Sequence, residues 1–296
     1  MLEEIRTYQA ALGAKLHYRE WCVPSPRGQV VILHGIESHS GWYLASGSFL
    51  AKKGFAVYAL DRRGSGLNLE GRGDTPSFKT LLEDIRIFIE GLPDLPHPTG
   101  QVQPRPEEQA HPPAPLHLIG ISWGGKLATA SALLHPEHIT SLILITPGLA
   151  SKVDFSTREK LDIFFSSLFA ARRKFKIPIE EPEMFTTNPQ KIEYIKADGL
   201  RLKEATARFF AESVKLDLFL RKRIYLLRKP LFLMLAAIDP IIDNQRIISL
   251  VEQIPADEKK IKVYADYHHT LEFEENPQEF LEDLAAWMEA HSARRD

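Results

Sequence analysis

The sequence has little of several features that mark whole classes of protein. Its 296 residues include one cysteine, Cys22, which excludes an intrachain disulfide and a cysteine-based zinc site. No apolar run approaches the roughly 18 residues of a membrane-spanning helix. The N-terminal segment MLEEIRTYQ also lacks the basic stretch and apolar run of a secretion signal. We therefore expect a cytoplasmic protein.

The sequence also lacks an excess of charge of either sign. Lys and Arg total 37 against 39 Asp and Glu, which gives a net charge of −2. Such a chain has no global field that attracts nucleic acid, so a nucleic-acid partner is not expected. Apolar residues make up 44% and charged residues 26%, the balance of a globular protein with a sizeable core. The length suits one large core, or a core with a lid.

Short apolar segments that alternate with helix-like segments indicate an α/β fold with a mostly parallel sheet. Several of these segments are apolar throughout, as expected where helices cover both faces of a sheet. Strands are predicted at 30–34, 55–60, 116–121, 142–146, 231–237 and 261–264, and helices near 43–53, 76–92, 124–135, 244–253 and 276–290. The first twenty or so residues, with Gly13 between two extended segments, favour an antiparallel hairpin.

Two segments interrupt this alternation. Residues 93–115 hold eight of the 20 prolines, which predicts an extended surface loop, with a proline-motif ligand as the alternative. Residues 151–229 hold 18 basic and 11 acidic residues and nine of the 16 phenylalanines. A basic, phenylalanine-rich helical insert predicts a lid over an apolar pocket, although phenylalanines that only pack the insert onto the body explain the pattern equally well. The expected organisation is a core of 1–150 and 230–296 with a lid of 151–229.

The pentapeptide Gly120-Ile121-Ser122-Trp123-Gly124 has the Gly-x-Ser-x-Gly pattern of a strained turn that exposes a nucleophilic serine. It follows a predicted strand and precedes a helix start rich in small residues, which is the setting that the motif requires. Side chains at 120 or 124 are expected to collide with the neighbouring helix or strand. The alternative is an ordinary Gly/Ser turn in an α/β crossover. We predict that Ser122 is a nucleophile.

A serine hydroxyl needs a base, and the base needs an orienting acid. Asp239 directly follows the predicted strand 231–237, whereas its competitor Asp243 is better placed to cap the next helix. The base lies among two adjacent histidines, His268 and His269, which position alone does not separate. A metal bound by this pair is disfavoured because neighbouring side chains point apart and no third ligand is evident.

An oxyanion hole needs two N–H donors. The segment Leu33-His34-Gly35-Ile36 ends the first strong strand, where Gly35 allows a sharp turn that presents the amide of Ile36 toward Ser122. Trp123 supplies the other amide. The alternative is an ordinary strand-to-loop turn.

The combined pattern resembles the α/β-hydrolase superfamily, and within it the monoacylglycerol lipase and lysophospholipase-like (serine aminopeptidase-type) group. The resemblance covers nearly the whole chain apart from the proline-rich loop, and it is weak over the lid. It rests on HGIESHSGWY at 34–43, DRRGSGLN at 61–68, GISWG at 120–124, the Asp239 loop, and YADYHHTLEFE at 264–274. In this group the ending of the chain has an aromatic residue, four further residues, and then a His-x-Leu sequence. Counting in this way from Tyr264 selects His269, which Thr270 and Leu271 follow.

The resemblance implies Ser122 as nucleophile, His269 as base, Asp239 as acid, and Ile36 and Trp123 as oxyanion donors. The chain departs from the group at three positions outside this set. Histidine is usual where Ser65 and Ile121 stand, and serine is usual where Asn68 stands.

We therefore predict a serine hydrolase that cleaves carboxylic esters with a moderately apolar acyl chain, such as a monoacylglycerol or a lysophospholipid, without a cofactor or metal. The alternatives are amide or peptide hydrolysis or acyl transfer by the same three residues, and a non-catalytic binding protein on this fold. The partner is a small ester or lipid, and the basic insert is compatible with peripheral membrane contact. The sequence leaves the oligomeric state open.

Overall fold

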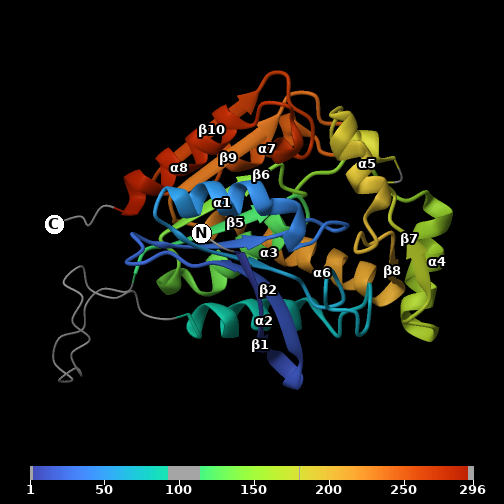
Figure 1. Ribbon diagram of the computed structural model, residues 1–296. Coiled ribbons are helices and arrows are strands. Elements are labelled where there is room, and N and C mark those ends of the chain that lie inside the picture. The colour runs from blue at the N-terminus through green and yellow to red at the C-terminus, as the bar shows by residue number, and fades with distance from the viewer. Residues whose placement is uncertain (1–2, 93–113, 180, 293–296) are drawn as a thin grey trace.

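A mostly parallel eight-stranded sheet forms the centre of the molecule (Figure 1). The computed structural model describes residues 3–92, 114–179 and 181–292. Neighbouring strands follow the order β1-β2-β4-β3-β5-β6-β9-β10, and all pairs from β4 to β10 are parallel. The strands are β1 (Glu3–Gln9), β2 (Lys15–Trp21), β3 (Gln29–Leu33), β4 (Ala56–Leu60), β5 (Leu116–Ile121), β6 (Ser141–Ile145), β9 (Leu231–Ala236) and β10 (Lys259–Tyr264).

The antiparallel hairpin predicted for the N-terminus is present as β1 and β2, and it joins the sheet through an antiparallel pair between β2 and β4. Every residue of β3, β4, β5, β6 and β9 is buried, as the apolar segments predicted. Helices cover both faces of these strands, because a strand that is apolar on both faces must bury both.

Helices α1 and α8 pack together on one face of the sheet, and α2 and α3 pack together on the other (Figure 1). Each predicted core helix is present with ends within two residues of expectation. The core helices are α1 (Leu44–Lys52), α2 (Phe78–Glu90), α3 (Gly124–Leu134), α7 (Asn244–Glu252) and α8 (Gln278–Ser292), with 3-10 turns at Ala11–Gly13, Ser40–Tyr43, Pro136–His138 and Leu271–Phe273.

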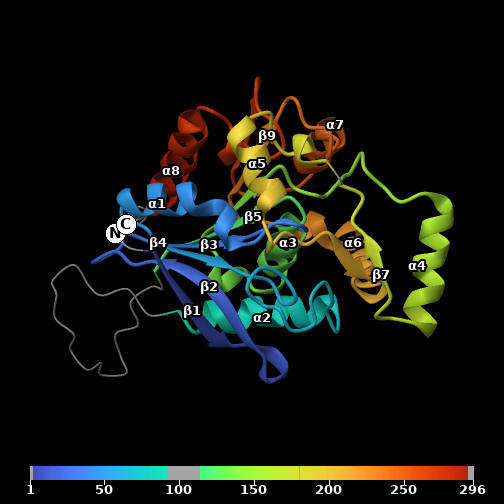
Figure 2. The ribbon, with the colours of Figure 1, turned by 45° about the vertical axis from the view of Figure 1, so that its right-hand side comes forward.

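Between β6 and β9 the chain leaves the sheet and forms a separate group of elements, most clearly seen in Figure 2. The expectation that this insert is helical is wrong in one respect, since β7 and β8 pair as a small antiparallel sheet. These elements are α4 (Thr157–Phe169), β7 (Lys174–Lys176), α5 (Pro189–Ala197), β8 (Glu204–Thr206) and α6 (Ala207–Arg223), with 3-10 turns at Pro182–Met184 and Ile224–Leu226. Helix α4 lies at the outer edge in both views.

Buried polar contacts tie the middle of this insert to the body. Asp198 accepts hydrogen bonds from Trp42 Nε1 at 2.8 Å and lies 3.0 Å from His39 Nε2. Arg201 donates to the buried carboxylate of Glu37 at 2.7 Å. The insert is therefore fixed to the loops that follow β3.

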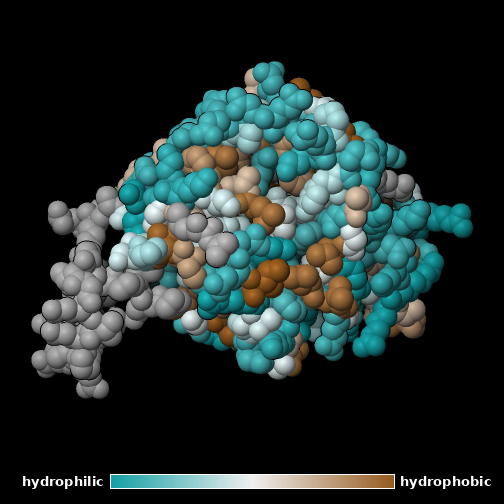
Figure 3. Space-filling view, viewed as in Figure 1, coloured by the Kyte–Doolittle hydropathy of each residue, from teal (hydrophilic) through white to brown (hydrophobic). Residues whose placement is uncertain are grey.

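The surface seen in Figure 3 is mainly hydrophilic, with separate groups of apolar side chains, as is usual for a globular protein. Over 3–92, 114–179 and 181–292 no helix is both long and apolar enough to cross a bilayer. The predicted proline-rich loop lies almost wholly outside the described residues, and it stays a prediction.

Candidate active site

Ser122 stands on a strained turn between β5 and α3. Its φ of +50° is in the left-handed region that non-glycine residues rarely adopt. A Cβ on Gly120 would lie 2.5 Å from Ala128 Cβ of α3, and one on Gly124 would lie 2.3 Å from the carbonyl oxygen of Leu33 on β3. The prediction that side chains at 120 and 124 collide with a helix and a strand is confirmed. Only glycine allows this turn to pack so closely.

His269 and Asp239 lie beside this serine. His269 Nε2 is 2.9 Å from Ser122 Oγ, and His269 Nδ1 is 2.8 Å from Asp239 Oδ2. Because a carboxylate only accepts, Nδ1 carries the imidazole proton and Nε2 is left to accept from the serine hydroxyl. The imidazole is buried, and Thr146 Oγ1 donates to the His269 carbonyl at 2.9 Å.

Asp239 is held by the loop that follows β9. Its Oδ1 accepts from the amides of Ile241 at 2.8 Å and Ile242 at 3.1 Å, so the carboxylate has a fixed orientation. Asp243 instead accepts from Arg246 N and caps α7, the role that sequence reasoning expected for it.

The two adjacent histidines face different partners. His268 Nδ1 lies 3.2 Å from Glu274 Oε1, and the His268 amide donates to the same oxygen at 2.8 Å. His268 therefore faces Glu274, whereas His269 faces Ser122. Within the residues that the structure describes, no group of three or more His, Cys, Asp or Glu side chains is arranged to hold a metal.

Ile36 and Trp123, whose backbone amides are the predicted oxyanion donors, both line the same pocket as Ser122. Across the described parts of the chain, neither amide donates to another protein group. A Cβ on Gly35 would lie 3.2 Å from Ser122 Cβ, which shows how closely this loop approaches the serine. Two amides without a protein partner among the described residues, on residues that share a pocket with Ser122, are able to bind the oxygen of a tetrahedral intermediate.

Arg62 and His34 form a buried cluster that contacts the loop after β3, and no role was predicted for either residue from the sequence. Arg62 Nη1 and Nη2 donate to the carbonyls of Gly35 and Ile36, each at 3.0 Å. Burial lowers the pKa of the Arg62 guanidinium to about 9. Burial and the nearby Arg62 charge hold the pKa of His34 well below its usual range, so His34 is neutral. The available signal for Arg62 was an arginine two residues after the end of β4, the neighbour of β3.

Ser122 lies on a pocket of about 1120 Å³ between the sheet and the insert. Much of its wall is apolar and comes from the insert and from the loops after β6 and β9. Apolar members of the wall include Leu149, Val153, Phe155, Ile163, Phe164, Leu168, Ile177, Ile179, Phe210, Val214, Ile241 and Ile242. Such a wall suits an apolar substrate.

The phenylalanines of the insert divide between the two roles considered from the sequence. Phe155, Phe164 and Phe210 line the pocket. Phe185 instead packs edge-on against the His269 ring, and Phe209 packs against the Trp123 ring. The insert therefore both walls the pocket and supports the residues around Ser122.

Comparison with known proteins finds a matching family model, related lipases and a solved structure of similar fold. The family model described as serine aminopeptidase, S33, matches residues 24–276. A monoacylglycerol lipase of Mycolicibacterium smegmatis is 24% identical, with 94% of each chain covered. Phospholipase YtpA of Bacillus subtilis is 22% identical over 85% of this chain and 91% of that protein. The crystal structure of Paleococcus ferrophilus monoacylglycerol lipase matches with a TM-score of 0.80 at 22% identity, over 93% of this chain and 99% of that one.

Proposed function

The chain belongs to the serine aminopeptidase S33 family of α/β-hydrolases, and we propose that it cleaves carboxylic esters through an acyl-enzyme intermediate on Ser122. The observation that carries this proposal is the pair of contacts that joins Ser122 Oγ, the His269 imidazole and the Asp239 carboxylate, at 2.9 and 2.8 Å. The site needs no cofactor for this chemistry.

The chemistry follows from the position of each proton. Ser122 Oγ attacks the ester carbonyl while His269 Nε2 takes the hydroxyl proton, and the Asp239 carboxylate stabilises the imidazolium. The amides of Ile36 and Trp123 bind the oxyanion. As the C–O bond breaks, His269 returns the proton to the leaving alcohol. A water molecule, deprotonated by His269, then attacks the acyl carbon, and Ser122 leaves with the proton.

We propose that the acyl chain is moderately apolar and that the substrate is a monoacylglycerol or a lysophospholipid. The apolar wall of the pocket supports the acyl chain, and the names of the relatives, monoacylglycerol lipase and phospholipase, support the two head groups. Arg221 and Arg246 at the same pocket are compatible with an anionic head group.

Amide or peptide hydrolysis is the second candidate, because the matching family model is described as an aminopeptidase. An aminopeptidase needs an acidic group that is available to bind the substrate α-ammonium. The pocket carboxylates are already paired with lysines, namely Asp154 with Lys160, Glu212 with Lys215 and Asp217 with Lys126. This pairing favours the ester.

We further propose that residues 151–229 act as a lid and that α4 contacts a lipid surface. Leu161, Phe164, Phe165, Leu168 and Phe169 are all exposed, and their spacing places them on one face of α4. Basic residues flank this face at both ends of the helix, and anionic lipid attracts basic residues. Replacing Phe165 and Phe169 with Glu is expected to abolish sedimentation with phosphatidylglycerol vesicles and to leave hydrolysis of a short soluble ester unchanged. Undiminished sedimentation would exclude this contact.

A substrate panel tests the proposed function. Rates for p-nitrophenyl esters from acetate to palmitate, a monoacylglycerol, a lysophospholipid and an aminoacyl p-nitroanilide separate ester from amide preference. We expect the esters of intermediate and long chains to be cleaved fastest. If the native protein neither reacts with a fluorophosphonate probe at Ser122 nor cleaves any ester, it is a binding protein on this fold.

A further inference from the structure

Arg62 lies behind the loop that carries the Ile36 amide, and the proposed mechanism leaves it without a role. The residue is 8% exposed. Of the ion pairs between described residues, none includes Arg62, and its Nε has no hydrogen-bond partner there. Burying a cation without a paired carboxylate is costly. Because the buried Arg62 cation has no carboxylate in an ion pair with it among the described residues, its position calls for a functional reason.

The hydrogen bonds of Arg62 fix the direction in which the loop amides point. Nη1 donates to the Gly35 carbonyl and Nη2 to the Ile36 carbonyl, each at 3.0 Å. In a trans peptide the carbonyl and the next N–H point in opposite directions. A carbonyl of Gly35 held toward Arg62 therefore turns the Ile36 N–H away from Arg62.

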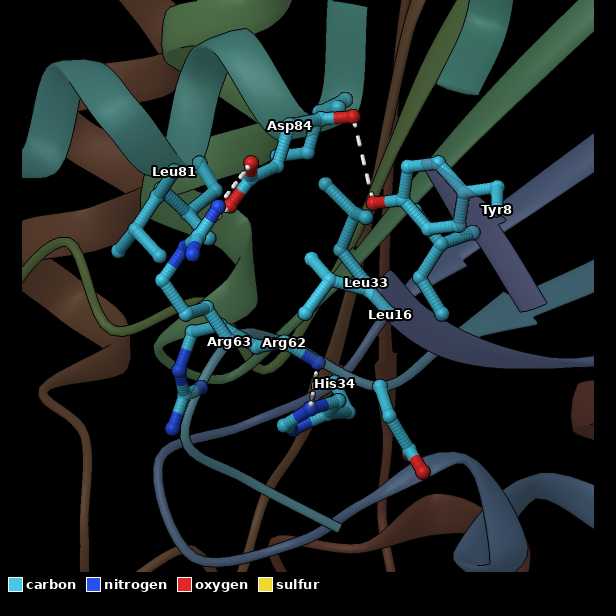
Figure 4. Close-up of a pocket in the computed structure, with 12 residues that line it drawn as sticks. Tyr8, Leu16, Leu33, His34, Arg62, Arg63, Leu81 and Asp84 are labelled. Atoms are coloured by element: carbon cyan, nitrogen blue, oxygen red, sulfur yellow. Dashed lines mark hydrogen bonds and ion pairs between the residues drawn. The ribbon is translucent and has the colours of Figure 1, made fainter. Parts of the chain in front are cut away.

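His34 reinforces the same peptide. Its Nε2 accepts from the Arg62 amide at 3.0 Å, so the imidazole proton is on Nδ1, which donates to the Gly35 carbonyl at 2.7 Å. The Gly35 carbonyl thus receives two donors, one from each neighbouring strand end. Figure 4 shows the His34 ring next to the Arg62 amide.

Arg62 also contacts the residue that supplies the second oxyanion donor. Its guanidinium carbon lies 4.8 Å from the centre of the Trp123 ring and 5.3 Å from the centre of the Phe209 ring. One side chain therefore touches the loop after β3, the start of α3 and, through Phe209, helix α6 of the insert.

We propose that Arg62 is a positioning residue of the oxyanion hole, which holds the Ile36 peptide and the Trp123 side chain so that both amides face the same oxygen. This inference rests on the proposed function. Arg62 acts through the loop and does not touch the substrate. Its loss is therefore expected to weaken binding of a tetrahedral adduct and to leave ground-state binding intact.

Two variants and a neighbouring control test this role. Arg62→Gln removes the charge and the two-pronged contact, while Arg62→Lys keeps the charge but not the planar fork. Arg63→Gln is the control, because Arg63 points to Asp84, away from the oxyanion loop (Figure 4). For each protein we would measure kcat and KM for p-nitrophenyl butyrate, Ki for a trifluoromethyl ketone of the same chain length, and Kd for the matching non-hydrolysable ether.

Arg62→Gln is expected to lower kcat and weaken the ketone about tenfold to hundredfold, somewhat less than complete loss of an oxyanion donor. KM and the ether Kd should stay within about twofold of the parent, because Arg62 does not touch the substrate and its loss removes no ground-state contact. Arg62→Lys should show the same changes in kcat and ketone Ki as Arg62→Gln. If Arg62→Gln fails to fold, the lysine variant alone tests the proposal.

Equal weakening of the ketone and the ether would overturn the proposal, since it would show a merely structural role. Unchanged ketone affinity in both variants would overturn it as well. If the parent protein itself neither hydrolyses the ester nor binds the ketone, the proposed function fails, and this outcome is distinct from a failure of the Arg62 variants alone.

Discussion

Asp239→Asn is expected to remove most of the activity while leaving the fold intact, for a reason that lies in the hydrogen bonds of the carboxylate. Oδ2 accepts from His269 Nδ1, and Oδ1 accepts from the amides of Ile241 and Ile242. Both oxygens of the side chain are therefore used only as acceptors. An asparagine has one acceptor and one donor, so it cannot replace both.

The two backbone amides decide how the asparagine turns. Its oxygen is expected to stay with Ile241 and Ile242, which directs the NH₂ group at His269 Nδ1. That nitrogen must then accept, the proton moves to Nε2, and His269 can no longer take the proton of Ser122. For the equivalent change in a well-studied serine protease kcat falls about 10⁴-fold, or about 5 kcal/mol of transition-state stabilisation at 1.36 kcal/mol per decade.

The assay compares kcat for p-nitrophenyl butyrate, with thermal unfolding as a check on the fold. Asp243→Asn is a matched control four residues further on, since Asp243 caps α7 and asparagine caps helices equally well. The control should keep its activity. A kcat for Asp239→Asn within tenfold of the parent, in a folded protein, would refute the reasoning about the tautomer.

Further substitutions test the other parts of the site. Ser122→Ala should lower ester hydrolysis by at least about 10³-fold without loss of structure, and activity near the parent level would exclude this nucleophile. His269→Ala should cost far more activity than His268→Ala, and the reverse ranking in the same assay would show that the wrong neighbour is assigned. Gly124→Ala should destabilise the protein by about 1–3 kcal/mol or more in urea unfolding, because its Cβ would overlap β3. Gly199→Ala is the control and should be near neutral, because the added Cβ would meet no atom of the described residues within 4 Å.

The elements of the core were predictable because their apolar residues follow the periods of buried strands and amphipathic helices. Strand β5 and helix α2 match their predicted spans closely for this reason. The turn at Ser122 was predictable because only glycine fits on either side of it. The two short strands β7 and β8 were not, since three-residue segments that are largely polar carry no period.

Other features depend on three-dimensional contacts. Adjacent His268 and His269 are alike in sequence position, and only the orientation of the loop assigns one to Glu274 and the other to Ser122. The role of Arg62 depends on two carbonyls on another strand end. Its neighbour Arg63 is also an arginine just after β4, but its guanidinium pairs with Asp84 instead.

The pairing of β6 with β9 has a practical consequence. Ser122 lies before this pair in the chain, and Asp239 and His269 lie after it, with the whole insert in between. A chain cut within the insert would give two pieces. One would hold Ser122 and the strands up to β6, and the other would hold Asp239, His269, β9 and β10. Neither piece alone holds a complete site, so ester cleavage would begin only when the halves reassemble, which would make this scaffold a reporter of fragment complementation.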